Sequence, residues 1–325
     1  MLEHGGQLRA EAAYYNIPLD QWLDVSTGIN PNGWIVPLLP TTVWARLPEI
    51  NDGLEQAAQQ YYDTSYLLAG AGSQAFIQAL PKLRAKCRVG IPDIGYAEHA
   101  HAWQQAGHDI VILPHDNLGF MLEQIDVLVV INPNNPTGYR YPKATLLNWQ
   151  QQLSQRGGWL IVDEAFMDVT PEYSLMPHSP LSGLIVLRSL GKFFGLAGAR
   201  VGFVAAEDAL LTLLNEYLGP WTLTGASREI AKHALMDEAW QQHTRAKLKQ
   251  ASDLLSYLLI QHELEPTGGT ALFQWVKTSK AEIIKTQLAR QGILVRLFKQ
   301  PHSLRFGLPQ DWQRLGQALS SLKNL

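Results

Sequence analysis

The chain contains very little cysteine: Cys87 is the single one among 325 residues. One cysteine cannot form a disulfide within the chain, and a metal site built from several cysteines is excluded. The sequence therefore predicts no metal centre, and we interpret Cys87 as a thiol that packs in the core.

The sequence also has no long apolar run and no run of basic residues. No stretch approaches the roughly 20 apolar residues of a membrane span, and the opening MLEHGGQLRAEAAYYN lacks the hydrophobic segment of a signal peptide. The 26 basic and 29 acidic residues give a formal net charge of −3, without the basic surface that nucleic acid requires. We expect a cytoplasmic protein that binds a small molecule, and neither a membrane nor nucleic acid.

Hydrophobic residues make up 46% of the chain and charged residues 17%, a composition typical of a folded globular protein. A chain of this length usually exceeds one compact core, so we expect a large domain and a smaller one. Neither a repeat nor a low-complexity linker marks the boundary. We place the large domain at residues 42–220, and the small domain with an N-terminal arm at 1–41 plus 221–325.

Short β-branched runs alternate with helix-length segments through the middle of the chain. The runs are apolar almost throughout, which favours strands of a mostly parallel sheet covered by helices on both faces. The expected strands are 88–91, 109–113, 127–131, 159–162, 184–187 and 201–205.

The C-terminal part has a different pattern, mainly helical at first and then mixed. We expect helices over 207–218 and 226–264, followed by a short α+β segment. In that segment the pattern predicts strands at 271–277, 293–297 and 303–306 around a helix at 280–291. This mixed segment is expected to form the smaller domain.

Polar residues that directly follow the apolar runs are the candidates for chemistry, since ligands of open α/β sheets bind beyond the carboxyl ends of the strands. NPNNPTG ends at Gly138 and reads on its own as a turn. Asp163 in VDEAF ends an apolar strand, where a carboxylate needs a cationic partner or serves as a helix cap. Lys192 in SLGKFFGLAGAR has neighbours that can lower the pKa of an amine, although an isolated lysine more often lies at the surface.

The order and spacing of Asn135, Asp163, Lys192 and Arg200 change this interpretation. The series resembles the class I/II aminotransferase family of pyridoxal 5'-phosphate (PLP) enzymes, and the resemblance covers nearly the whole chain. It implies fold type I: an α/β fold whose large domain has a mostly parallel central sheet flanked by helices, with a smaller α+β domain. It also implies a homodimer.

The resemblance implies catalytic roles for Lys192 and Asp163. Lys192 would hold PLP as a Schiff base and afterwards act as the general base. Asp163 would pair with the protonated pyridine nitrogen, which lets the ring accept electrons from the α-carbon of the substrate. Asn135 would hydrogen-bond the phenolic oxygen of the ring.

The resemblance also implies a binding site for the cofactor phosphate. Ser189 and Arg200 would hold it, Arg200 with a charge-assisted fork. Gly72, Ser73 and Gln74 in AGAGSQAF would begin a helix whose backbone N–H groups face the same phosphate, although such a start can equally be a plain helix cap.

Tyr96 in IGYAEH matches the aromatic residue that stacks on the cofactor ring in this family, although a core aromatic would look the same in the sequence. Two positions depart from the commoner pattern. Phe166 stands where many relatives have a tyrosine that donates to the phenolic oxygen. Leu47 stands where relatives have a tyrosine that reaches the phosphate of the partner subunit, so that contact is in doubt.

Four further segments are similar to one branch of the family, the threonine-phosphate decarboxylases of cobalamin biosynthesis: HGGQ, LDVSTGINPNG, DEAFMD and GPWTL. In that branch the substrate is O-phospho-L-threonine and the product is (R)-1-amino-2-propanol phosphate. The resemblance implies substrate contacts from His4, Gly5, Asn30, Asn135, Arg296 and Arg305.

Two arginines suit a substrate that carries both a phosphate and a carboxylate, but which arginine binds which group stays open. The reaction stays open too, because the bond held perpendicular to the cofactor plane is the one that breaks. A histidinol-phosphate-type aminotransferase is the alternative, and the missing tyrosines at Leu47 and Phe166 count against it.

Two interpretations from other classes are weaker. A binding or regulatory protein that kept the fold without catalysis would not need Asp163, Lys192 and Arg200 together. A Rossmann-type nucleotide binder would carry G-x-G-x-x-G after its first strand, and this chain does not.

Overall fold

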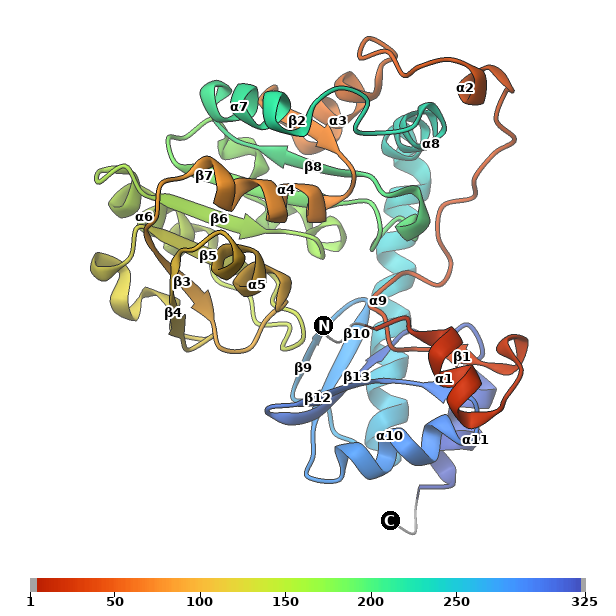
Figure 1. Cartoon of the computed structure of the whole chain (residues 1–325). Helices are drawn as coiled ribbons and strands as arrows, with labels where there is room; N and C mark the ends of the chain where they lie inside the picture. The colour runs from red at the N-terminus through yellow and green to blue at the C-terminus, as the bar shows by residue number, and fades with distance from the viewer. Residues whose placement is uncertain (1–4, 323–325) are drawn as a thin grey trace. The chain divides into compact units, whose positions relative to one another are not determined.

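The computed structural model describes residues 5–322, which form two compact units. Unit 2 comprises Gly33–Asn135 and Tyr139–Gln242, and unit 1 comprises the rest of the described chain. The helix α9 (Glu238–Ile260), labelled in Figure 1, contains the last boundary between the units, so its first turn belongs to unit 2 and the remainder to unit 1.

Unit 2 is built on a seven-stranded sheet with the order β2-β8-β7-β6-β5-β3-β4. Its strands are parallel except β8, which is antiparallel to both of its neighbours. The strands are β2 (Leu67–Gly70), β3 (Arg88–Pro92), β4 (Asp109–Leu113), β5 (Val127–Ile131), β6 (Trp159–Asp163), β7 (Leu184–Ser189) and β8 (Gly202–Ala205).

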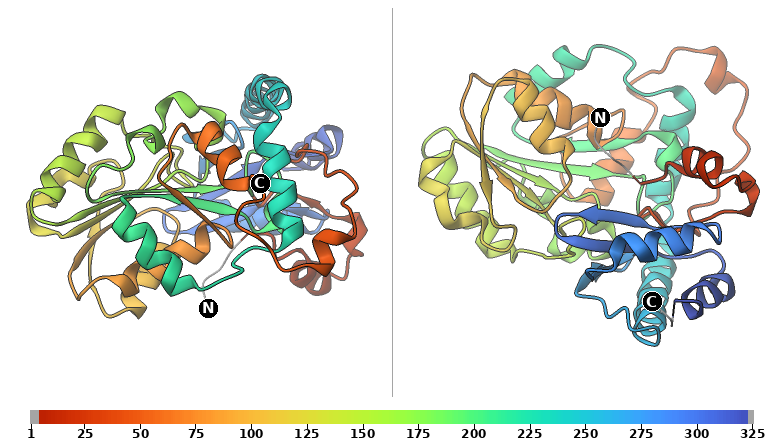
Figure 2. Two further views of the ribbon diagram at one scale, coloured as in Figure 1. Left: turned by 90° about the horizontal axis from the view of Figure 1, so that it is seen from above. Right: turned by 60° about the horizontal axis from the view of Figure 1, so that its bottom comes forward.

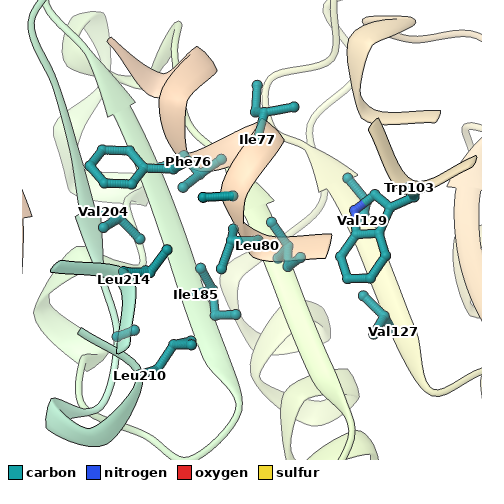
Figure 3. Packing of buried hydrophobic residues seen from close by; sticks show 14 of the residues in the cluster. Phe76, Ile77, Leu80, Trp103, Val127, Val129, Ile185, Val204, Leu210 and Leu214 are labelled. Atoms are coloured by element: carbon teal, nitrogen blue, oxygen red, sulfur yellow. The ribbon is translucent and has the colours of Figure 1, made fainter. Parts of the chain in front are cut away.

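Helices cover both faces of this sheet (Figure 2). On one face, α4, α5 and α7 pack with alternate strand residues; Figure 3 shows Phe76 of α4 beside Val204 of β8. In the central strands β5, β6, β7 and β8 the intervening residues are also fully buried, which explains why these sequence runs are apolar without alternation. The helices of unit 2 are α2 (Thr42–Ala45), α3 (Leu54–Tyr62), α4 (Ser73–Ala79), α5 (Glu98–Gln105), α6 (Lys143–Ser154), α7 (Asp208–Leu218) and α8 (Gly225–Met236).

The predicted α/β fold with a mostly parallel central sheet is confirmed, and all six strands predicted for the large domain are present. β2 was not predicted, because LLAG is short and runs directly into a glycine-containing turn. The helix expected over 226–264 is instead two helices, since the backbone of Asp237 leaves the helical region between α8 and α9.

Unit 1 contains an antiparallel sheet with the order β12-β13-β10-β9 and a separate parallel pair, β1 with β11. α10 packs on β12 and β13. The strand expected at 293–297 is divided, because β11 pairs with β1 whereas β12 pairs with β13. The elements are α1 (Leu8–Tyr15), β1 (Leu23–Asp24), β9 (Gly268–Thr270), β10 (Phe273–Lys277), α10 (Ala281–Ala289), β11 (Ile293–Leu294), β12 (Arg296–Lys299), β13 (His302–Gly307) and α11 (Trp312–Ser320).

The compact units do not end where the sequence analysis places the domain boundaries. The expected boundary after residue 220 lies ahead of α8, but α8 packs against α3 and so belongs to unit 2. The short segment Pro136–Gly138 belongs to unit 1, where the backbone of Thr137 and Gly138 lies against Gly268 and Gly269.

A fully buried group of charges lies beneath the strand ends of unit 2. The Arg188 guanidinium donates to Glu164 at 2.8 Å and also to Asp168, and all three side chains are at most 1% exposed. Asp168 accepts a hydrogen bond from the Tyr61 hydroxyl of α3 at 3.1 Å. Although burial lowers it, the carboxylates hold the pKa of Arg188 above its usual range, so the guanidinium stays cationic.

We predict that Arg188→Met strongly destabilises unit 2. The substitution leaves two buried carboxylates without their cation, which costs about 3–5 kcal/mol in the free energy of unfolding. Urea unfolding of the cofactor-free protein measures the change. Lys249→Met, which removes an ion pair that is 76% exposed on the lysine side, is the control and should unfold like the wild type. Equal stability of the two variants would contradict the prediction.

Candidate active site

One cavity of unit 2 lies at the carboxyl ends of its parallel strands. Eight of the nine residues predicted to bind the cofactor line this cavity, and the ninth, Gly72, immediately precedes α4 beside it. The lining consists of Ser73, Gln74, Tyr96, Ile131, Asn135, Asp163, Ala165, Phe166, Ser189, Lys192 and Arg200.

Asp163 ends β6 and is only 3% exposed, so its carboxylate depends on hydrogen bonds from the protein. Oδ1 accepts from the backbone N–H of Ala165 at 3.0 Å, and Oδ2 lies 2.9 Å from Nε2 of His99. An ionised carboxylate only accepts, so His99 must donate. The side chain of Asp163 is therefore oriented from two sides.

His99 was not identified in the sequence analysis. It belongs to the first turn of α5, is 1% exposed, and has its ring edge-on to Tyr96 with a centroid distance of 6.2 Å. The sequence feature that could have identified His99 is the spacing of YAEH, because a histidine three residues after a cavity aromatic can face the same cavity from a helix. One helical turn thus supports both Tyr96 and Asp163.

Lys192 lies in a tight turn that follows β7. Backbone hydrogen bonds from Leu190 to Val201 and from Gly195 to Lys192 close the turn, at 3.1 Å each. Phe193 is fully buried and anchors it. The ammonium of Lys192 is 5.6 Å from the centre of the Phe166 ring, so the residue that replaces the family tyrosine forms an apolar wall beside the amine.

Arg200 and Gly72 depend on each other. Arg200 has a left-handed backbone (φ 54°, ψ 49°), and Gly72 has φ +74°. A Cβ atom on Gly72 would be 2.7 Å from Nη2 of Arg200, so only glycine leaves room for the guanidinium in this position. Ser189, at the end of β7, has its hydroxyl 3.3 Å from the backbone N–H of Gly191.

Of the predicted substrate residues that the structure describes, Gly5, Asn30, Arg296 and Arg305 belong to unit 1, and Asn135 belongs to unit 2. Arg296 and Arg305 are directly opposite each other across the antiparallel pair β12 and β13. Burial lowers the pKa of Arg305 to about 10, and the charge of Arg296 contributes to the same effect. Like charges placed opposite each other are unfavourable, so the pair favours an anionic ligand.

Asn30 and Gly5 are the other described substrate candidates of unit 1. Asn30 is 4% exposed and its side chain accepts from Asn32 at 3.0 Å, which shapes the turn. A Cβ on Gly5 would be 2.7 Å from the carbonyl of Ser26, so the N-terminal segment lies tightly on residue 26. His4 lies outside the described residues.

Ser26 is a second residue that the sequence analysis missed as an individual position. Its carbonyl accepts from Nη2 of Arg305 at 2.7 Å, and its hydroxyl accepts from the backbone N–H of Gly6 at 2.8 Å. The hydroxyl also donates to Asp24 at 2.6 Å. Ser26 therefore connects the glycines of the N-terminal segment to Arg305.

Leu47, the other departure from the family pattern, is 66% exposed in unit 2. Cys87 is half-buried with its sulfur 3.3 Å from Nδ1 of His108, and burial raises the pKa of its thiol.

Within residues 5–322, no cluster of histidine, cysteine or acidic side chains has the arrangement of a metal site. Over the same range, no helix has the length and apolar character to cross a membrane.

Known proteins resemble this chain over nearly its whole length. The family model described as aminotransferase class I and II matches residues 45–324. Threonine-phosphate decarboxylase from Pseudomonas aeruginosa is 52% identical over 99% of this chain and 98% of the relative, and the protein of that name from Sinorhizobium sp. is 37% identical over 98% of each.

A solved structure shows the same fold. The histidinol-phosphate aminotransferase of Sinorhizobium meliloti, in complex with pyridoxal-5'-phosphate, matches with a TM-score of 0.81 at 19% identity. The match covers 99% of this chain and 95% of that chain.

We predict that Gly72→Ala weakens PLP binding about tenfold, because the new methyl group displaces Arg200 from the cavity. Titration of the cofactor-free protein with PLP, followed by absorbance, gives the dissociation constant. Gly157→Ala is a matched control: Gly157 has φ +67°, but nothing lies within 4 Å of its Cβ position. Equal dissociation constants of PLP for the two variants would contradict the role of Gly72 in making room for Arg200.

Proposed function

The chain belongs to the class I and II aminotransferase family, and we propose that it is a PLP-dependent lyase that decarboxylates O-phospho-L-threonine. The Cα–carboxylate bond of the substrate breaks, CO2 leaves, and a proton takes its place, which gives (R)-1-amino-2-propanol phosphate. The observation that carries the proposal is the similarity to two threonine-phosphate decarboxylases over essentially the full length of each chain.

The donor set of the cavity in unit 2 fits PLP. The buried carboxylate of Asp163 suits the protonated pyridine nitrogen, and the Lys192 amine suits the aldehyde. Gly72 leaves room for the guanidinium of Arg200. That guanidinium suits a phosphate, because it offers two parallel donors. Asn135 and Ser189 add polar groups to the same cavity.

PLP supplies an electron sink that stabilises the charge left on the α-carbon when CO2 departs. The negative carboxylate of Asp163 would keep the pyridine nitrogen of bound PLP protonated, and His99 and the Ala165 N–H hold that carboxylate in place. Lys192 would hold the cofactor and then deliver the proton to Cα. The apolar wall of Phe166 would assist this proton transfer by excluding water beside the amine.

The arginine pair of unit 1 accounts for the anionic groups of the substrate. O-phospho-L-threonine carries a carboxylate and a phosphate, and bidentate guanidinium groups suit both. The lowered pKa of Arg305 also favours an anionic ligand, because a bound anion would stabilise the charged guanidinium that burial disfavours.

A histidinol-phosphate-type aminotransferase is the second candidate, since proteins of that kind share the fold. The relatives at 52% and 37% identity favour the decarboxylase. A homodimer, a cytoplasmic location and a place in cobalamin biosynthesis remain predictions from the family resemblance.

The deciding experiment is product analysis with O-phospho-L-threonine and PLP. We expect one CO2 and one amino-propanol phosphate per substrate consumed, with no dependence on 2-oxoglutarate. Lys192→Ala should reduce the rate at least about a thousandfold, because the residue that binds the cofactor and moves the proton is removed. Glutamate formed from 2-oxoglutarate without CO2 release would instead identify an aminotransferase.

We also predict that Arg296→Met raises the KM for O-phospho-L-threonine about tenfold or more, because a charge-assisted fork to the substrate is lost. The dissociation constant of PLP should not change, since Arg296 belongs to unit 1 and not to the cofactor cavity. Steady-state kinetics and PLP titration measure the two quantities. Arg290→Met, at an exposed position of the same unit, is the control. An unchanged KM would exclude Arg296 as a substrate ligand.

A further inference from the structure

The side chain of Gln74 is hydrogen-bonded at both ends inside unit 2. Its Oε1 atom accepts from the Tyr96 hydroxyl at 3.2 Å, and its Nε2 atom donates to Oε2 of Glu98 at 2.9 Å. Gln74 belongs to α4, Glu98 begins α5, and Tyr96 lies in the segment just before α5. The three side chains form one chain of hydrogen bonds that ends at the wall of the cofactor cavity.

Glu98 sets the direction of this chain. A carboxylate can only accept, so it selects the NH2 end of the Gln74 amide and turns the amide oxygen towards Tyr96. Tyr96 must then donate its hydroxyl proton. Burial raises the pKa of Tyr96 to about 12, with further contributions from Glu98 and Asp163, so the phenol keeps that proton at any physiological pH.

The hydrogen-bond chain fixes the ring of Tyr96 at its hydroxyl end. The ring packs nearly perpendicular to that of His99, with an interplanar angle of 83°, and His99 itself holds Asp163. Because the side-chain amide of Gln74 is already bonded at both ends, we expect the contribution of this residue to a phosphate to come from its backbone N–H.

We propose that Glu98 is a positioning residue, which acts through Gln74 to hold the ring of Tyr96 as the aromatic wall of the PLP cavity. The inference rests on the proposed function only in that PLP is the occupant of this cavity. Glu98 is not among the residues that line the cavity, so its effect on a bound cofactor would pass through Gln74 and Tyr96. A displaced Tyr96 ring would lose packing area against a planar ligand, so PLP binding should report on Glu98.

A purely structural role is the competing explanation, because α4 and α5 pack against each other. In that case Glu98 would stabilise the fold irrespective of the Tyr96 hydroxyl. The two roles differ in whether the effect of changing Glu98 passes through residue 96. A double-mutant cycle measures this difference.

The test compares Glu98→Leu, Tyr96→Phe and the double variant, each as full-length cofactor-free protein titrated with PLP and no substrate. We expect each single variant to weaken PLP binding about three- to tenfold, the usual effect of one lost hydrogen bond, with a shifted absorption band of the bound cofactor. The double variant should bind PLP no more weakly than Tyr96→Phe, because Tyr96→Phe already removes the hydrogen bond through which Glu98 and Gln74 hold the ring. Glu98→Gln retains an acceptor and should stay within about twofold of the wild type.

Gln104→Leu, on the exposed face of α5, is the control for changes to that helix. If Glu98→Leu does not fold, Gln74→Met removes both hydrogen bonds and replaces it in the cycle. Losses that multiply in the double variant, or a Glu98→Leu protein that melts at a lower temperature but binds PLP normally, would overturn the positioning role and leave the proposed function intact. A wild-type protein that binds no PLP would overturn both.

Discussion

The buried guanidinium of Arg188 is the interaction on which the geometry of unit 2 depends. Arg188 immediately precedes Ser189 at the end of β7, and its partner Glu164 immediately follows Asp163 at the end of β6. Separating these charges would leave one of them buried without compensation, so the two strand ends have little freedom to move apart. Asp168 extends the same constraint to α3 through Tyr61. The cavity is therefore lined by side chains whose backbone positions are fixed beneath it.

Above this base, three of the side chains that line the cavity are positioned by neighbouring residues. His99 and a backbone N–H orient Asp163, the space at Gly72 admits Arg200, and the Gln74 amide connects Tyr96 to α5. Preorganisation of this kind lowers the cost of ordering the site when a ligand binds. The arginine pair of unit 1 differs, because Arg296 and Arg305 are like charges opposite each other and a bound anion relieves their repulsion.

Much of the site could be predicted because its signals are local. Apolar runs with polar residues directly after them placed Asp163 at a strand end, and the parallel sheet then had to bring such ends to one edge. The roles of His99, Glu98 and Ser26 were missed for a physical reason. Each acts through a partner distant in sequence, and spacing along the chain does not reveal which helix turn faces which strand end.

The sequence by itself determined the class of fold, and its family resemblance named eight of the residues that line the cavity of unit 2. Those properties follow from strand hydrophobicity, turn residues and ordered motifs that survive without tertiary detail. Only the tertiary structure decided that Pro136–Gly138 and α8 belong to different units, that β11 and β12 separate, and that Gln74 is bonded at both ends. These depend on long-range packing and hydrogen-bond partners, which are set when the chain closes on itself and not by neighbours in the sequence.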